Sequence, residues 1–335
     1  MRIALVIVAV AALLSASLAR AEEAALDPTL ATPVLITSAT NVITITCATP
    51  DTLLLYTIDG SDPVIRSGPY LAPIALPHGG VVKVRAFSAD RKRKGAPAEL
   101  TVASFTPGQP APASSLVAVT QGREWPGYEW AKRHAAICAT VRERKPQIVF
   151  IGDSITHFFG GQPHDKGGTG EAVWQKAYEP RNAVNLGYGW DRTENVLWRV
   201  GPGEELDGAK PKVAVIMIGT NNLGLNQPAD IAAGITAICA LIHQRLPATK
   251  ILLLGIFPRG EKPDANRQRI TEINQIIAKL DGHDGVTFLD FGAKFIGPDG
   301  IISRSIMPDF LHPNAAGYQI WVDAMEPTLA KLLAE

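Results

Sequence analysis

The sequence has no excess of charge of either sign and only three cysteines among its 335 residues. Its 32 basic and 32 acidic residues give a formal net charge of zero. A chain without net positive charge does not attract a polyanion such as nucleic acid through its overall charge, so we expect no nucleic-acid partner. The cysteines, Cys47, Cys138 and Cys239, lack metal-ligand spacing, and we expect no metal site. They are expected to be small buried apolar side chains, with a Cys138–Cys239 disulfide as the alternative.

Long hydrophobic runs are absent after the N-terminal segment, so we expect no membrane span in the mature protein. The N-terminal run, Ile3 to Leu14, is shorter than the about 20 apolar residues that cross a bilayer. Arg2 precedes this run, and Ala19-Arg20-Ala21 has the small-x-small pattern of a cleavage site. Residues 1–21 are therefore predicted to be a cleaved signal peptide, and the protein is predicted to be secreted or periplasmic.

Residues 31–106 have the pattern of a small all-β sandwich. Short runs with alternating apolar residues are separated by turn signals rich in Gly, Pro and Asp. The basic run 91–94 is expected to be a solvated hairpin turn. Residues 107–120 are rich in Pro, Ala and Ser and are predicted to form a linker. The expected strands include 42–46, 53–58 and 81–87.

Residues 121–335 alternate between apolar, strand-length runs and stretches with helical periodicity. Strands that are apolar on both faces indicate a parallel sheet covered by helices, and hence a three-layer α/β/α sandwich. Ligands of such sheets bind at the carboxyl ends of the strands. The expected strands are 148–151, 183–186, 213–218, 251–254 and 286–289, and the expected helices include 229–245, 267–280 and 315–333.

Polar residues follow three of the expected strands. Ser154 lies on a turn from strand into helix, which would expose its hydroxyl, although a helix N-cap is the alternative. Asn221 can aim its amide at an oxyanion or form an Asx turn. Asp309 can accept Nδ1–H of His312 and leave Nε2 facing a nucleophile, or both can be surface residues. Together these residues match the roles of one acyl-transfer reaction.

The motifs around these residues resemble the SGNH/GDSL hydrolases. The resemblance rests on Gly152-Asp153-Ser154-Ile155, Gly219-Thr220-Asn221-Asn222 and Asp309-x-x-His312, and it covers about residues 140–333. It is closest to the catalytic subunits of platelet-activating-factor acetylhydrolase, through residues 196–199, 211–212 and 258–263. The family likeness implies a flavodoxin-like fold and a serine esterase that needs no cofactor.

The resemblance also implies roles for individual residues. Ser154 would be the nucleophile, His312 the base and Asp309 its orienting partner. The Ser154 N–H and the Asn221 amide would donate to the oxyanion. The family has glycine before Asp191, where this chain has Trp190, whose N–H can donate if its backbone angles suit a residue with a Cβ. The candidate substrate contacts are Asp153, Asp191, His157 and Asn222, and for His157 a solvent-facing position is the alternative.

A second resemblance concerns the N-terminal module. Residues 56–63, followed by Tyr70 and residues 82–85, are similar to the small β-sandwich at the C-terminal end of chitobiases and β-hexosaminidases. Such modules accompany secreted carbohydrate-active enzymes. We therefore predict an esterase that removes short acyl groups, mainly O-acetyl groups, from a glycan or another small ester. The alternatives are a lipid or short-chain ester hydrolase and a non-catalytic glycan-binding protein; the sequence does not predict the oligomeric state.

Overall fold

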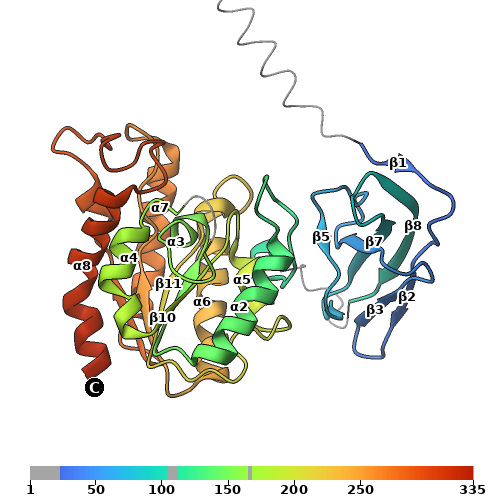
Figure 1. Cartoon of the computed structure of the whole chain (residues 1–335), viewed down its shortest axis with the longest axis horizontal. Helices are drawn as coiled ribbons and strands as arrows, with labels where there is room; N and C mark the ends of the chain where they lie inside the picture. Colours follow the sequence, from blue (N-terminus) through green and yellow to red (C-terminus); the bar gives the residue numbers. More distant parts are fainter. Residues whose placement is uncertain (1–22, 105–111, 165–167, 335) are drawn as a thin grey trace, which may run out of the picture. The chain divides into compact units, whose positions relative to one another are not determined.

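The computed structural model describes residues 23–104, 112–164 and 168–334 (Figure 1). The chain forms two compact units, one ending at Phe105 and the other beginning at Thr106. The predicted signal peptide, residues 1–21, lies outside the described residues. Over the described ranges, we find no helix with the length and apolar character needed to cross a bilayer.

The first unit is built from two β-sheets, as the alternating pattern predicted. Ile43 and Ile45 of β3, like Val82 and Val84 of β7, point into the core because successive strand residues face opposite sides. One sheet has the order β1 (Ala25–Leu26), β8 (Arg93–Val102), β7 (Gly80–Phe87), β4 (Leu53–Thr57), β5 (Gly68–Pro69), and the other has the order β2 (Val34–Thr37), β3 (Val42–Thr46), β6 (Ile74–Ala75).

The structure adds strands at the edges of this unit that the sequence did not reveal. Strand β1 lies before residue 31, where the module was predicted to begin, and pairs in parallel with β8. The basic run 91–94 lies at the β7–β8 hairpin, partly in the turn and partly in the first residues of β8. The hairpin prediction for this run therefore agrees with the structure.

The second unit has a parallel five-stranded sheet, which confirms the predicted α/β class. Its order is β10 (Ala183–Gly187), β9 (Ile148–Gly152), β11 (Val213–Met217), β12 (Lys250–Leu254), β13 (Val286–Leu289). Gly152 at the end of β9 is in register with Gly187 of β10 and with Met217 of β11. The loops after these three strands therefore start side by side at one edge of the sheet.

Helices cover both faces of this sheet: α4 and α8 lie on one side, and α5 and α6 on the other (Figure 1). The three-layer prediction is thereby confirmed. The α-helices are α2 (Trp130–Arg144), α3 (Ser154–His157), α4 (Glu171–Ala177), α5 (Thr193–Val200), α6 (Pro228–Arg245), α7 (Ala265–Ile277) and α8 (Ala315–Ala334). Short 3-10 helices are η1 (Ser114–Leu116), η2 (Glu179–Arg181), η3 (Thr220–Asn222), η4 (Ala278–Leu280) and η5 (Gly292–Phe295).

An aromatic cluster joins the sheet to the helices on the α4/α8 side. The ring centroid of Phe150 on β9 lies 5.0 Å from that of Trp174, and the Phe159 ring stacks on Tyr318 at 4.3 Å. Each such buried side chain contributes roughly 1.5–3 kcal/mol to folding. The Tyr318 hydroxyl also donates to the carbonyl of Ile155 at 2.6 Å. This packing ties α8 to the turn that carries Ser154.

Part of the predicted linker 107–120 packs on the second unit. The Ser115 hydroxyl donates to the carbonyl of Asp230 at 2.8 Å, and the Thr193 hydroxyl donates to the carbonyl of Ser115 at 2.9 Å. Residues 114–116 therefore belong with the α/β unit. A Pro/Ala/Ser-rich composition predicts little apolar burial, but it does not reveal that serines find specific partners.

All three cysteines are free thiols, so the Cys138–Cys239 disulfide considered above is not formed. Cys138 and Cys239 are buried, as expected for small apolar side chains, whereas Cys47 is half-buried.

Candidate active site

Ser154 lies directly after the end of β9, as the first residue of α3. The turn is tight, because a Cβ on Gly152 would come within 2.2 Å of the Thr156 hydroxyl and 2.5 Å of the carbonyl of Met217. Only glycine fits there. The Asp153 side chain caps α3 by accepting a hydrogen bond from the Ile155 amide at 2.9 Å. The Ser154 side chain is thereby directed to the edge of the sheet.

His312 comes from the loop before α8 and meets Ser154 across 158 residues of sequence. The Ser154 Oγ lies 2.8 Å from His312 Nε2, and Asp309 Oδ2 lies 2.6 Å from His312 Nδ1. A carboxylate beside Nδ1 favours the tautomer with its proton on that nitrogen. Nε2 is then free to accept the hydroxyl proton, which is the geometry required for general-base activation of a serine.

The Asp309 carboxylate is held by more than the imidazole. Its Oδ1 accepts the backbone N–H groups of His312 at 2.8 Å and Leu311 at 3.1 Å. Partial burial raises the pKa of Asp309, but the hydrogen bonds from the His312 side chain and backbone outweigh it, so the pKa lies below its ordinary value. Asp309 is therefore a carboxylate at neutral pH.

Asn221 lies in η3, after β11. Its Nδ2 donates to the carbonyl of Asp191 at 2.9 Å, and its own carbonyl accepts from Arg192 Nε at 3.2 Å. The amide carries two N–H groups, and the bond to Asp191 occupies one of them. Both the backbone and the side chain of Asn221 are thus fixed beside the loop that follows β10.

Trp190 lies in that loop with a φ of 64° and 52% of its surface exposed. This φ is in the left-handed region, which costs a residue with a Cβ about 1–2 kcal/mol. The backbone therefore keeps a conformation that favours glycine, the residue expected there from the family likeness. The sequence alone did not show that a tryptophan would adopt it.

Asp191 is fully buried beneath this loop. It accepts hydrogen bonds from Trp130 Nε1 at 2.8 Å, Gln121 Nε2 at 3.1 Å and Arg199 Nε at 2.8 Å. Burial raises the pKa of Asp191, and the neighbouring Arg199 opposes that effect. Because its oxygens are engaged by the protein, we assign Asp191 to the support of the loop and not to substrate contact.

The Arg199 side chain connects the loop after β10, through Asp191, with the end of β9, through Gly152. It pairs with Glu205 as well as Asp191, and its Nη2 donates to the carbonyl of Gly152 at 3.4 Å. Its guanidinium also lies 3.9 Å from the ring centroid of Tyr188. Arg199, Glu205 and Tyr188 were missed as functional candidates, because their meeting with Asp191 depends on tertiary contacts. The only signal was that Arg199 belongs to the segment 196–199 of the family likeness.

The other candidate substrate contacts are also buried. Asn222 donates to Glu194 at 2.9 Å and accepts from the Thr193 amide at 3.1 Å, which is a supporting role. His157 is buried among aromatic rings, with the Tyr128 ring centroid at 5.2 Å, so it does not face solvent. Burial raises the pKa of Asp153 to about 7, although the Ile155 amide and Arg259 lower it.

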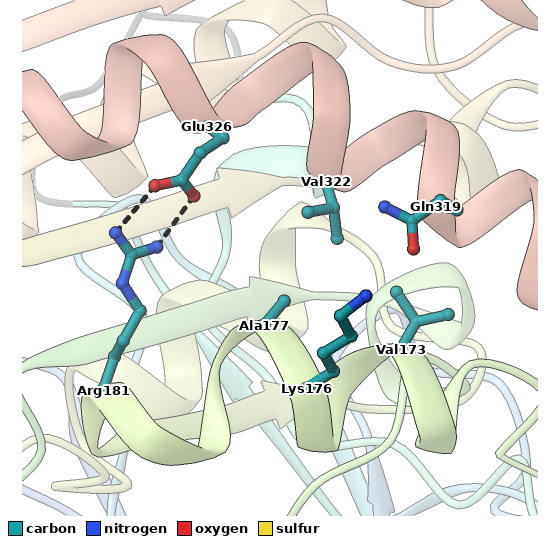
Figure 2. Close-up of a pocket in the computed structure, with 7 residues that line it drawn as sticks. All are labelled: Val173, Lys176, Ala177, Arg181, Gln319, Val322 and Glu326. Carbon is teal, nitrogen blue, oxygen red and sulfur yellow. Dashed lines mark hydrogen bonds and ion pairs between the residues drawn. The ribbon is translucent and has the colours of Figure 1, made fainter.

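A surface hollow lies elsewhere, between α4 and α8 (Figure 2). Val173, Lys176 and Ala177 approach it from one helix and Gln319 and Val322 from the other, and none of the residues lining it belongs to the site around Ser154. At one end Arg181 makes two bonds to Glu326, at 2.8 and 2.7 Å. Within the described ranges, no three His, Cys, Asp or Glu side chains gather as potential metal ligands.

Comparison with known proteins adds family information to this geometry. Residues 150–320 match the model of the GDSL-like lipase/acylhydrolase family, and residues 43–96 match a model described as Fn3 associated. The likeness of the N-terminal module to the chitobiase sandwich therefore stays a prediction.

Individual relatives cover most of the second unit. Platelet-activating factor acetylhydrolase IB subunit alpha1 of Homo sapiens is 35% identical over 207 residues, which are 62% of this chain and 85% of that protein. The alpha2 subunit of Rattus norvegicus is 36% identical over 207 residues, 62% of this chain and 86% of that protein. A crystal structure titled as an acylhydrolase from Bacteroides fragilis has a TM-score of 0.50 at 18% identity, covering 62% of this chain and 99% of its own, which shows a shared fold.

Proposed function

This chain belongs to the GDSL-like lipase/acylhydrolase family and is an ester hydrolase, and we propose that it works through Ser154, His312 and Asp309 on short acyl esters. The observation that carries the proposal is that hydrogen bonds join these three side chains in series. The Ser154 Oγ to His312 Nε2 distance is 2.8 Å, and the His312 Nδ1 to Asp309 Oδ2 distance is 2.6 Å. Each group stands within hydrogen-bond reach of the next, as proton transfer requires.

In the first step, Ser154 Oγ attacks the ester carbonyl while its proton passes to His312 Nε2. The carbonyl oxygen becomes an oxyanion. We assign its stabilisation to the N–H of Ser154, the amide of Asn221 and the N–H of Trp190. Removing one such donor in other acyl-transfer enzymes costs about 3 kcal/mol. His312 then gives its proton to the leaving alcohol, and an acyl group remains on Ser154.

In the second step, water replaces the alcohol. His312 accepts a proton from the water as its oxygen attacks the acyl carbonyl, and the same donors receive the oxyanion. The bond to Ser154 Oγ breaks, His312 returns the proton to that oxygen, and the free acid leaves. The Asp309 carboxylate stabilises the positive charge that His312 carries in both steps. No metal or organic cofactor enters the scheme.

For the substrate, we propose O-acetyl groups on carbohydrates. Two features of the chain support this proposal: the signal-like composition of residues 1–21, which favours export, and the separate all-β unit before the hydrolase unit. The curated relatives favour a second candidate, a lipid or short-chain ester hydrolase, because the alpha1 subunit at 35% identity is named for platelet-activating factor. A non-catalytic glycan-binding protein is not retained.

The proposal is tested by acid release from a panel of esters. The panel pairs acetylated xylan and acetylated sialic acid with a short-chain acetyl phospholipid and p-nitrophenyl esters of increasing chain length. Wild type and Ser154→Ala are run side by side. Acetate release from a glycan, with a steep fall for acyl chains beyond two carbons, supports the carbohydrate esterase. Preference for the phospholipid or for longer chains overturns it in favour of the second candidate.

A further inference from the structure

The backbone and the side chain of Trp190 are both unusual for a residue of its kind. Its φ of 64° is in the left-handed region, where residues with a Cβ are disfavoured. The residue is 52% exposed, which leaves about half of a large and mainly apolar surface in contact with solvent. Folding therefore gains little from placing a tryptophan here. Such an outlier, held in place by its surroundings, points to a role in function.

The neighbours of Trp190 hold it firmly. The carbonyl of Gly189 accepts from Gln121 Nε2 at 2.9 Å. On the other side, the side chain of Asp191 is fully buried, and its carbonyl accepts from Asn221 Nδ2 at 2.9 Å. The residues before and after Trp190 are thus anchored, so the backbone that carries the indole is held on both sides. A rigid aromatic side chain loses little conformational entropy when it binds a ligand.

The loop that carries Trp190 lies beside Ser154, the proposed nucleophile. Strand β10 pairs with β9 so that Gly187 lies opposite Gly152, and the Tyr188 amide continues the pairing by donating to the carbonyl of Gly152 at 3.1 Å. Ser154 follows Gly152 by two residues, and Trp190 follows Tyr188 by two residues. The backbone of Trp190 therefore lies beside the site around Ser154, and its side chain is half exposed there.

We propose that the exposed indole of Trp190 is a stacking platform for the sugar ring of the substrate and determines its preference for glycan esters. This inference rests on the proposed carbohydrate esterase function. An acetyl group is too small to use an indole face, whereas the alcohol part of a polymeric ester extends out of the site past its rim. The C–H groups on one face of a pyranose ring pack against the electron-rich face of an indole.

The experiment compares two esters that carry the same acetyl group. One is acetylated xylan or acetylated sialic acid, whichever the wild type hydrolyses better, and the other is ethyl acetate, whose alcohol has no ring. The measured quantity is the ratio of kcat/KM for the glycan ester to kcat/KM for ethyl acetate. A change in oxyanion stabilisation alters kcat/KM for both esters alike and cancels in the ratio, because both esters use the same backbone N–H of residue 190.

Trp190→Gly is expected to lower this ratio about tenfold, mainly through KM of the glycan ester. Trp190→Phe, which keeps an aromatic face, is expected to stay within about threefold of wild type. Ile276→Ala removes an exposed apolar side chain from α7 and serves as the matched control, with no change in the ratio expected.

The outcomes separate the inference from the proposed function. If the wild type releases acetate from a glycan and Trp190→Gly leaves the ratio unchanged, the stacking platform is wrong and the esterase proposal stands. If the wild type releases no acetate from either glycan, the stacking platform and the carbohydrate esterase proposal are both overturned.

Discussion

Asp309 contacts His312 through both of its carboxylate oxygens. Oδ2 lies 2.6 Å from the imidazole Nδ1, and Oδ1 accepts the backbone N–H of the same histidine at 2.8 Å. Because the two residues are three positions apart in sequence, one tight turn fixes both the ring and the backbone of His312. Because the turn holds the Asp309 carboxylate against Nδ1, the carboxylate can fix the histidine tautomer.

Replacing this carboxylate by an amide tests its role. We predict that Asp309→Asn lowers kcat for p-nitrophenyl acetate by about 10³-fold or more, because an amide at this position no longer requires a proton on Nδ1. Asp323→Asn on the exposed side of α8 is the control and should change kcat less than about twofold. Wild-type turnover by a folded Asp309→Asn protein would contradict the role given to this residue.

The adjacent pair Asn221 and Asn222 allows two roles to be separated. We predict that Asn221→Ala lowers kcat by about 10²–10³-fold with a small change in melting temperature, because an oxyanion donor is lost. Asn222→Ala should instead lower the melting temperature, since it leaves the Thr193 amide and the Glu194 carboxylate without their bonds in a buried place. The measurements are steady-state kinetics and thermal unfolding of both variants. Equal losses of kcat in the two variants would contradict a catalytic role for Asn221 and a structural role for Asn222.

The buried ion pairs of Arg199 are expected to matter for stability. Arg199→Leu leaves the buried Asp191 without its cationic partner and Glu205 with only His134 and the Tyr188 hydroxyl, which costs roughly 3–5 kcal/mol. For a domain of this size, the melting temperature should fall by about 10 °C. Arg181→Ala is the matched control, because the Arg181–Glu326 pair is 30% and 39% exposed and contributes about 1 kcal/mol or less. Similar losses from the two variants would count against the prediction.

Asp153 should make stability fall as pH rises. Its pKa is raised from 3.8 to about 7 by burial, so between these values the folded protein holds a proton that the unfolded chain releases. The free energy of unfolding therefore decreases with rising pH across this window. Asp153→Asn keeps the Oδ1 acceptor for the Ile155 amide and has no charge, so its advantage in melting temperature over wild type should grow from pH 4 to pH 8. A difference that is the same at both ends would rule out this titration.

The fold was largely predictable because its strands have distinctive sequences. β9 and β11 are apolar on both faces, and their observed bounds differ from the predicted ones by one residue. The two-residue strands β5 and β6 were not found, since two residues show no periodicity. Carboxyl ends of parallel strands share one edge of a sheet, so Ser154 and Asn221 could be grouped from the sequence.

Contacts within the site were harder to predict. Asp191 and Asn222 follow strands and are polar, which made them candidates for substrate contact. Their partners, Arg199, Trp130 and Glu194, are brought to them by packing, which no local pattern encodes. The positive φ of Trp190 was equally hidden, because a tryptophan disfavours that conformation and the surrounding loop imposes it.

The central claim is that Ser154 is the nucleophile, and the most direct measurement is the kcat of Ser154→Ala on p-nitrophenyl acetate beside the wild type. The far-UV circular dichroism and melting temperature of both proteins establish that the variant is folded. We predict a loss of turnover of at least about 10³-fold, with the melting temperature within a few degrees of wild type. Unchanged turnover by the folded variant would contradict the account.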